Sequence, residues 1–134
     1  TYTLHMLKDF EKKNGEIEEG DVILFHFGWE EKYGIGAESG EFLKDWAGLG
    51  GDAAQYLLDK RVKAVGTDAL ALDPFGSEDY PCHYILLGNG IPIIENLTNL
   101  HKLPIFSYVI GLANKIKDGS ASPIRVIAFT DKGQ

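Results

Sequence analysis

The first half of the chain alternates between segments with helical and with strand periodicity. Apolar residues recur at a spacing of three among charged ones over residues 3–14, which predicts a helix. The apolar stretch at 22–27 predicts a strand. Residues 51–61 predict a second helix, for which Asp52 is the expected N-cap. The glycine-rich segment at 30–48 is expected to be a loop with one short helical turn, and a loop of this length is often functional.

The second half of the chain is dominated by short apolar stretches. The stretch CHYILLGNG at 82–90 is compatible with either a helix or a strand, whereas FSYVIGLANKI at 106–116 favours a strand over a helix. Residues 62–73 predict a buried strand followed by a turn, residues 91–97 a strand that runs into a loop, and residues 124–131 a closing strand. Strands that alternate with few helices predict a mixed fold, α/β or α+β, in a single domain over 1–134.

Length and composition are those of one globular domain. The chain has 134 residues, of which 44% are hydrophobic and 25% charged. Its formal net charge of −7, without any basic cluster, argues against a nucleic-acid partner. No apolar run approaches the roughly 18 residues of a membrane span, so no membrane association is predicted. The single cysteine and a start unlike a signal peptide predict a reducing, cytoplasmic location. Because the chain starts with Thr1, we expect it to be processed, truncated or part of something longer.

The stretch YPCHYILLGNGIPIIENL at 80–97 places an ionisable side chain at either end of an apolar segment. His83 opens the segment and Glu95 closes it. A buried carboxylate needs an ion partner, hydrogen bonds or a metal. Imidazole nitrogen together with carboxylate oxygen suits zinc, manganese or iron. From spacing alone, the commoner interpretation is a core histidine bonded to a backbone carbonyl and a glutamate that caps a turn.

Other polar and aromatic side chains are candidates for a site or for the core. Asp68 and Asp73 follow the apolar stretch VKAVG, and α/β domains carry functional loops at such strand ends. A turn cap is the preferred interpretation of Asp73, and for Asp68 a cap and a functional role are equally favoured. Trp29 is either a core aromatic or the wall of a pocket. Cys82 is interpreted as a small core residue, since on a strand its neighbour His83 would point to the opposite face.

Four stretches carry a resemblance to a known family. They are GDVILFHFGW, DAAQYLLDKRVKAVGTDALALD, HYILLGNGIPIIENLTNL and SPIRVIAF, and they occur in this order. Together they resemble the carboxy-terminal half of the cyclase family, which includes bacterial kynurenine formamidase and isatin hydrolase, over residues 17–129. The resemblance implies a swivelling β/β/α fold and metal-dependent hydrolysis of an amide or related acyl bond. It also implies that His83 and Glu95 bind a divalent metal, zinc or manganese, and we expect Trp29 and Asp68 to line the substrate pocket.

The chain departs from the family pattern in its first metal-binding motif. Family members carry His-x-Gly-Thr-His-x-Asp-x-Pro, whereas VGTDAL in this chain has no histidine beside it. His26 and Phe27 stand where relatives more often have arginine and threonine. His5 and His101 lie in polar stretches and are expected to be solvated, so no catalytic residue is assigned.

Two functions from different classes are therefore predicted. The first is a metal-dependent hydrolase of a small-molecule amide, either arylformamidase-like or acting on a cyclic amide, with metal-activated water as the nucleophile. Its missing ligands would come from another segment or another chain, and a homo-oligomer is expected. The second is a non-catalytic, truncated cyclase-like domain that acts as a binding or interaction module. An upstream stretch with the His-Gly-Thr-His-Asp pattern would favour the first.

Overall fold

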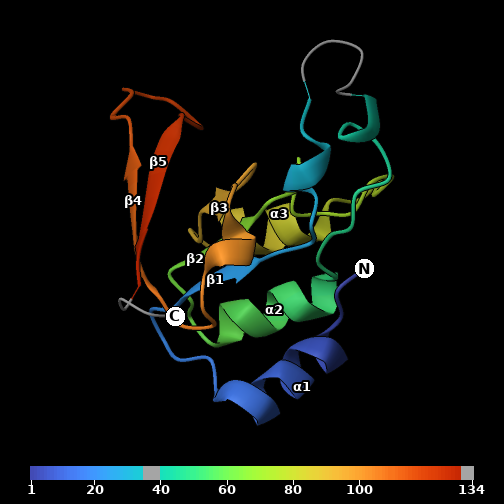
Figure 1. The fold of residues 1–134 in the computed structure, drawn as a ribbon, viewed down its shortest axis with the longest axis vertical. Coiled ribbons are helices and arrows are strands. Elements are labelled where there is room, and N and C mark those ends of the chain that lie inside the picture. The colour runs from blue at the N-terminus through green and yellow to red at the C-terminus, as the bar shows by residue number, and fades with distance from the viewer. Residues whose placement is uncertain (35–39, 131–134) are drawn as a thin grey trace. The chain divides into compact units, whose positions relative to one another are not determined.

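The computed structural model describes residues 1–34 and 40–130, drawn as a ribbon in Figure 1. The predicted domain over 1–134 comprises two compact units, Thr1–His101 and Lys102–Gln134. Each unit carries its own β-sheet, and the combination of helices and sheets confirms the mixed α/β class. Among the described residues, no helix combines the length and the apolar character needed to cross a membrane.

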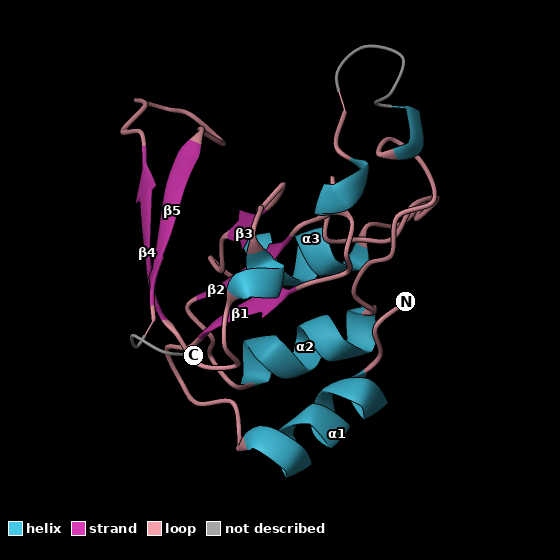
Figure 2. Cartoon of the chain, in the orientation of Figure 1, coloured by secondary structure: helices cyan, strands magenta, loops and turns pink. Residues whose placement is uncertain are grey.

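The first unit is built on a parallel sheet of three strands in the order β1-β2-β3 (Figure 2). The strands are β1 (Val22–Phe25), β2 (Ala64–Thr67) and β3 (Ile93–Ile94). Phe25 lies opposite Thr67, and Gly66 lies opposite Ile94. Because the strands run in one direction, the segments that follow them leave from the same edge of the sheet. In open α/β sheets this edge is where ligands bind, so those segments are the place to look for a site.

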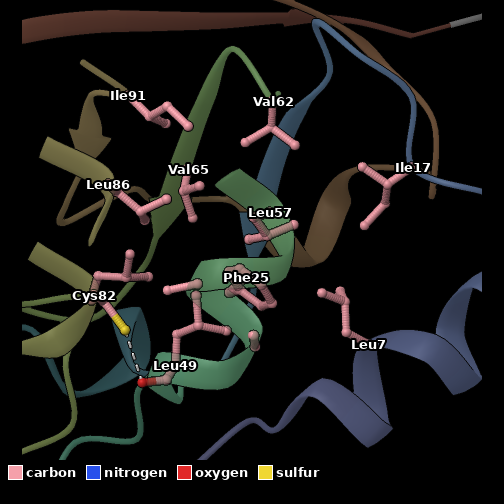
Figure 3. Packing of buried hydrophobic residues seen from close by; sticks show 13 residues of the cluster. Leu7, Ile17, Phe25, Leu49, Leu57, Val62, Val65, Cys82, Leu86 and Ile91 are labelled. Atoms are coloured by element: carbon pink, nitrogen blue, oxygen red, sulfur yellow. Dashed lines mark hydrogen bonds between the residues drawn. The ribbon is translucent and has the colours of Figure 1, made fainter. Parts of the chain in front are cut away.

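Helices bury the apolar side of this sheet. The helical elements are α1 (Leu4–Asn14), η1 (Glu30–Lys32), α2 (Gly51–Asp59), α3 (Pro81–Leu87) and η3 (Leu100–Lys102). Figure 3 shows Leu57 of α2, Leu86 of α3 and Val65 of β2 in one packed cluster, and all three are fully buried. Burying a side chain of this size stabilises the fold by about 1.5–3 kcal/mol, which is why these elements assemble.

Two predictions of local structure are decided in this unit. The ambiguous stretch at 82–90 is helical, as α3. The prediction that Asp52 is the N-cap of α2 is wrong, because Gly50 occupies the cap position and Asp52 lies in the first turn. The Asp52 carboxylate instead accepts the backbone amide of Ala53 at 2.8 Å and that of Leu4 at 3.2 Å. It therefore joins the start of α1 to the start of α2.

The carboxylate of Glu11 joins α1 to the loop that follows it and to the C-terminal end of α2. It accepts the backbone amide of Ile17 and the hydroxyl of Tyr56, both at 2.8 Å, and Lys60 Nζ lies 3.5 Å away. Burial alone would raise the pKa of Glu11, but these hydrogen bonds and the lysine charge outweigh it and lower that pKa below its ordinary value. A carboxylate whose pKa is lower in the folded chain stabilises the fold above its unfolded pKa, and that stabilisation is lost as the pH falls.

We expect Glu11→Gln to reduce the free energy of unfolding by about 1.5–3 kcal/mol at neutral pH, the range for hydrogen bonds to a charged group. The variant should also lose part of the acid sensitivity of the parent chain, because glutamine has no proton to take up. Urea unfolding at neutral pH and at a pH below 4.5, the ordinary pKa of a glutamate, measures both effects. Glu18→Gln is the control, since Glu18 is exposed and its side chain makes no hydrogen bond or ion pair with the residues that the structure describes. Equal effects of the two variants would contradict the prediction.

The second unit contains one antiparallel pair of strands. These are β4 (Tyr108–Ala113) and β5 (Ile124–Phe129), with Tyr108 opposite Phe129 and Ala113 opposite Ile124. The pair confirms the strands predicted within 106–116 and 124–131. The last residue of the second prediction, Asp131, lies outside the described residues.

Candidate functional site

His83, Asp73 and Glu95 come together beyond the strand ends, and we call these three residues the His83 cluster. Asp73 follows β2, Glu95 follows β3, and His83 lies in the first turn of α3. His83 Nε2 lies 3.3 Å from Glu95 Oε1, and His83 Nδ1 lies 2.5 Å from Asp73 Oδ2. The side chains of His83 and Glu95 are 31% and 32% exposed, so solvent reaches the gap between them, whereas Asp73 is buried. The structure therefore brings the two predicted ligands together.

Asp73 holds the first turn of α3 in place. Its carboxylate accepts the backbone amides of Cys82 at 2.9 Å and His83 at 3.1 Å. These amides belong to the helix start, where no intrahelical acceptor exists, and Tyr80 at the N-cap position provides no side-chain acceptor. The turn-cap interpretation of Asp73 holds only in part, because the carboxylate caps the start of α3, nine and ten positions further along the chain, and not its own turn. The same carboxylate also fixes the imidazole, a role that the sequence did not indicate.

The segment that carries Asp73 is itself held rigidly. Leu49 donates its backbone amide to the carbonyl of Leu72 at 2.8 Å. A Cβ atom at Gly48 would lie 2.3 Å from the backbone nitrogen of Pro74, so only glycine allows this close approach. Leu72 in turn donates its own amide to Glu95 Oε1 at 3.3 Å. Two consecutive residues, Leu72 and Asp73, thus position both members of the His83–Glu95 pair.

Asp68 shapes the turn between β1 and η1. Its Oδ1 accepts the backbone amide of Phe27 at 2.8 Å, and its Oδ2 accepts those of Trp29 at 2.7 Å and Glu30 at 3.4 Å. The residue is only 1% exposed, so the carboxylate is a buried charge that these amides satisfy. The geometry supports a structural role for Asp68, and its membership of a substrate pocket stays a prediction.

Trp29 lies in a small apolar cluster that is separate from the main core. It packs with Phe42 and Ala69, and its indole nitrogen donates to the carbonyl of Phe42 at 2.9 Å. Lys32 Nζ lies 3.5 Å from the centre of the indole ring, which is a cation–π contact. The side chain is thus largely engaged in packing, and its predicted role as a pocket wall stays a prediction.

A second group of ligand-type side chains lies near the same edge of the sheet. We call His26, Glu30 and His101 the Glu30 cluster. Their nearest ligand atoms all lie within 4.8 Å of one another. Glu30 Oε1 lies 2.8 Å from His101 Nδ1 and 3.9 Å from His26 Nε2. His101, expected to be solvated, is half-exposed but makes this specific contact.

The Glu30 carboxylate is held in one orientation by its other oxygen. Glu30 Oε2 accepts the hydroxyl of Thr98 at 2.7 Å and the backbone amide of Asn99. Burial opposes ionisation of Glu30, but the hydrogen bonds from His101, Thr98 and Asn99 outweigh it and lower the pKa of Glu30 to about 2. Glu30 is therefore a carboxylate anion throughout the physiological pH range.

Cys82 is confirmed as a small core residue. It is fully buried in α3, and its thiol donates to the carbonyl of Leu49 at 3.1 Å (Figure 3). Burial, together with the negative charge of Asp73, raises the pKa of the Cys82 thiol. The thiolate needed for nucleophilic attack is therefore disfavoured. Cys82 and His83 do not lie on opposite faces of a strand, as the sequence suggested, because they are consecutive residues of the helix α3.

Sequence reasoning missed the second role of Asp73 and the whole Glu30 cluster. The position of Asp73 after an apolar strand could have indicated a role at the site. The same position also fits a turn cap, so it did not distinguish the two roles. For the Glu30 cluster, the spacing of His26 and Glu30 by four residues was a usable signal. Its third member lies 71 positions beyond Glu30, so only the fold reveals it.

Comparison with known proteins shows which family and which solved structures the chain resembles. The family model described as "Putative cyclase" matches residues 1–74. A kynurenine formamidase of Salinibacter ruber is 40% identical over 76 residues, which cover 57% of this chain and 36% of that protein. The crystal structure of an isatin hydrolase with the product analogue thioisatinate has a TM-score of 0.88 at 30% identity and covers 97% of this chain and 53% of that one.

A third similar protein is described as a potential metal-dependent hydrolase with cyclase activity. Its structure has a TM-score of 0.68 at 29% identity and covers 88% of this chain and 56% of that chain. The chain thus spans about half the length of the solved structures it matches, and less of the formamidase.

Proposed function

Because the chain belongs to the cyclase family, we propose that it forms part of a metal-dependent hydrolase that cleaves an amide bond, with His83 and Glu95 as metal ligands. The similar proteins are named kynurenine formamidase, isatin hydrolase and metal-dependent hydrolase, which supports an N-formyl arylamine or a cyclic amide as the substrate class. The observation that carries the proposal is the 3.3 Å approach of His83 Nε2 to Glu95 Oε1, with Asp73 behind the imidazole.

The geometry of the His83 cluster fits a divalent ion. Two ligand atoms that each lie about 2.0–2.2 Å from one ion are about 2.8–3.6 Å apart, with the shorter separations in octahedral and the longer ones in tetrahedral coordination. The observed 3.3 Å between nitrogen and oxygen falls in that range. The 2.5 Å contact with Asp73 favours a proton on His83 Nδ1, which leaves the Nε2 lone pair facing Glu95. A neutral imidazole lone pair beside a carboxylate oxygen is repulsive unless a cation or a proton lies between them.

Each residue of the cluster has a distinct task in this proposal. A bound zinc or manganese ion would supply a water of lowered pKa and would polarise the scissile carbonyl. His83 and Glu95 provide two ligand atoms, Asp73 fixes the tautomer and direction of the imidazole, and Leu72 directs the Glu95 carboxylate through its amide. Two protein ligands leave several coordination positions open. Water, or side chains of another segment or chain, would complete the site.

The test of this proposal is a zinc titration of the purified chain, followed by NMR through the ring Cε1–Hε1 signals of its four histidines. The His83 signal is expected to shift on zinc binding, and Glu95→Gln should weaken that binding by more than about tenfold, since even the loss of outer-shell partners costs 10- to 100-fold. His5→Gln is the matched control, because His5 only forms an exposed pair with Asp9. A His83 ring signal that does not shift when zinc is added would contradict the proposal.

Hydrolysis of an N-formyl arylamine with added zinc or manganese extends the same test. With two ligands, the chain alone should stay well below about 1 turnover per second, the low end of ordinary enzymes. Activity that appears only with a segment carrying the His-Gly-Thr-His-Asp pattern, and that His83→Gln removes, would support the proposal. Zinc binding without hydrolysis under both conditions would favour the alternative, a binding or interaction module.

A further inference from the structure

We infer that the Glu30 cluster is a second divalent-metal site, of the zinc-binding type, in which His26 Nε2, Glu30 Oε1 and His101 Nδ1 are the ligands. The three side chains come from two distant segments: His26 from the turn after β1 and Glu30 from the adjoining η1, and His101 from η3 after β3. Two imidazole nitrogens and one carboxylate oxygen form a ligand set that zinc uses in sites with an open fourth position. The site shares no residue with the His83 cluster, so it does not depend on the proposed function.

The distances within the Glu30 cluster suit a single ion. Ligands at zinc bond lengths in a tetrahedron lie about 3.3 Å apart. The two distances to Glu30 Oε1, 2.8 Å from His101 Nδ1 and 3.9 Å from His26 Nε2, lie on either side of this value. The ring centres of the two histidines are 6.1 Å apart and their planes are tilted by 43°, so the rings do not stack on each other. Small side-chain rotations would place all three atoms around one ion.

The surroundings of Glu30 prepare one oxygen for coordination. Thr98 and Asn99 occupy Oε2, which leaves Oε1 directed at the two imidazoles. Hydrogen bonds of this kind orient ligating carboxylates in metal sites. The Glu30 side chain is 8% exposed, whereas those of His26 and His101 are 40% and 48% exposed. The cluster therefore has a buried, fixed anion on the inside and a solvent-facing side through which an ion can enter.

A second buried carboxylate strengthens the case for a cation at this position. Asp68 Oδ2 lies 3.9 Å from His26 Nε2, at the same distance as Glu30 Oε1. The side chain of Asp68 is completely buried and remains held by backbone amides, so it acts as an outer-shell charge and not as a ligand. Two carboxylates that face one imidazole nitrogen lower the energy of a cation there.

The experiment is the zinc titration described above, followed here through the NMR ring signals of His26 and His101. The His26 and His101 ring signals are expected to shift together with one apparent dissociation constant. His26→Gln should abolish the zinc response of His101 and weaken binding at this site by more than about tenfold. This variant leaves the contacts of Glu30 with Thr98, Asn99 and His101 in place, so its fold should survive. His5→Gln should leave the response unchanged.

The possible outcomes separate this site from the proposed hydrolase site. If His26 and His101 respond while His83 does not, the second site stands and the proposed function fails. If only His83 responds, the proposed function stands and the second site fails. Independent shifts of His26 and His101 at the zinc concentrations that move His5 would overturn the inference, because they would indicate surface binding to separate rings. Zinc should also raise the melting temperature of His83→Gln but not that of the double variant His83→Gln/His26→Gln.

Discussion

Asp68→Ala is expected to remove most of the folding stability of the first unit. The substitution leaves the backbone amides of Phe27, Trp29 and Glu30 without their acceptor, of which that of Trp29 is buried and the other two are partly buried. Each buried donor left unpaired costs about 1–3 kcal/mol. Even with partial relaxation, the total approaches the roughly 5–15 kcal/mol by which a domain is stable. The variant should therefore be unfolded, or melt far below the parent chain.

Thermal and urea unfolding of Asp68→Ala measure this effect, with Asp79→Ala as the matched control. Asp79 is exposed and makes no contact among the described residues, so its replacement should change stability by less than about 0.5 kcal/mol. Asp68→Asn should fall between the two, because it keeps one acceptor oxygen and places an amide group against a backbone donor. An Asp68→Asn chain with parent stability and impaired ligand binding would instead assign the residue to the substrate pocket.

In the first unit, the sequence predicted secondary structure correctly where the periodicity of apolar residues agrees with their burial in the fold. Strand β2 is buried at all four positions, and its apolar run predicted a strand within 62–73. The stretch at 82–90 stayed ambiguous because α3 is only seven residues long, too short for helical periodicity to separate it from a strand. Asp52 matched the composition of an N-cap, but the start of α1 competes for the same carboxylate. Local signals cannot predict such a contact between distant segments.

Of the candidate site, too, the sequence predicted one part and left another part to the structure. The resemblance to the cyclase family indicated His83 and Glu95, and the fold brings these two side chains to 3.3 Å. The role of Asp73 depends on the turn at Tyr80, which has a positive φ of 43° and stands directly before α3. Non-glycine residues rarely adopt this conformation, so no pattern in the sequence predicts it. Polar contacts across the fold are therefore what the structure adds to the sequence.

Asp73→Asn is expected to weaken metal binding at the proposed His83–Glu95 site by about 10- to 100-fold, the effect of losing an outer-shell partner of a ligating histidine. The carboxylate favours a proton on His83 Nδ1 and keeps Nε2 free for coordination. An asparagine amide would donate to Nδ1 instead, which moves the ring proton to Nε2 and blocks the lone pair that faces Glu95. The carbonyl oxygen of asparagine can still accept the amide of Cys82, so most of the α3 cap should remain.

Two measurements on Asp73→Asn distinguish loss of positioning from loss of structure. Nitrogen-15 chemical shifts of the His83 ring report which nitrogen carries the proton, and the zinc titration reports affinity at the same residue. The variant should show the proton on Nε2 and weaker binding, while the zinc response of His26 and His101 stays at the parent value. Asp79→Asn should leave the His83 tautomer and affinity unchanged. Unaltered zinc affinity in a folded Asp73→Asn chain would show that Asp73 only caps α3 and does not prepare His83 for a metal.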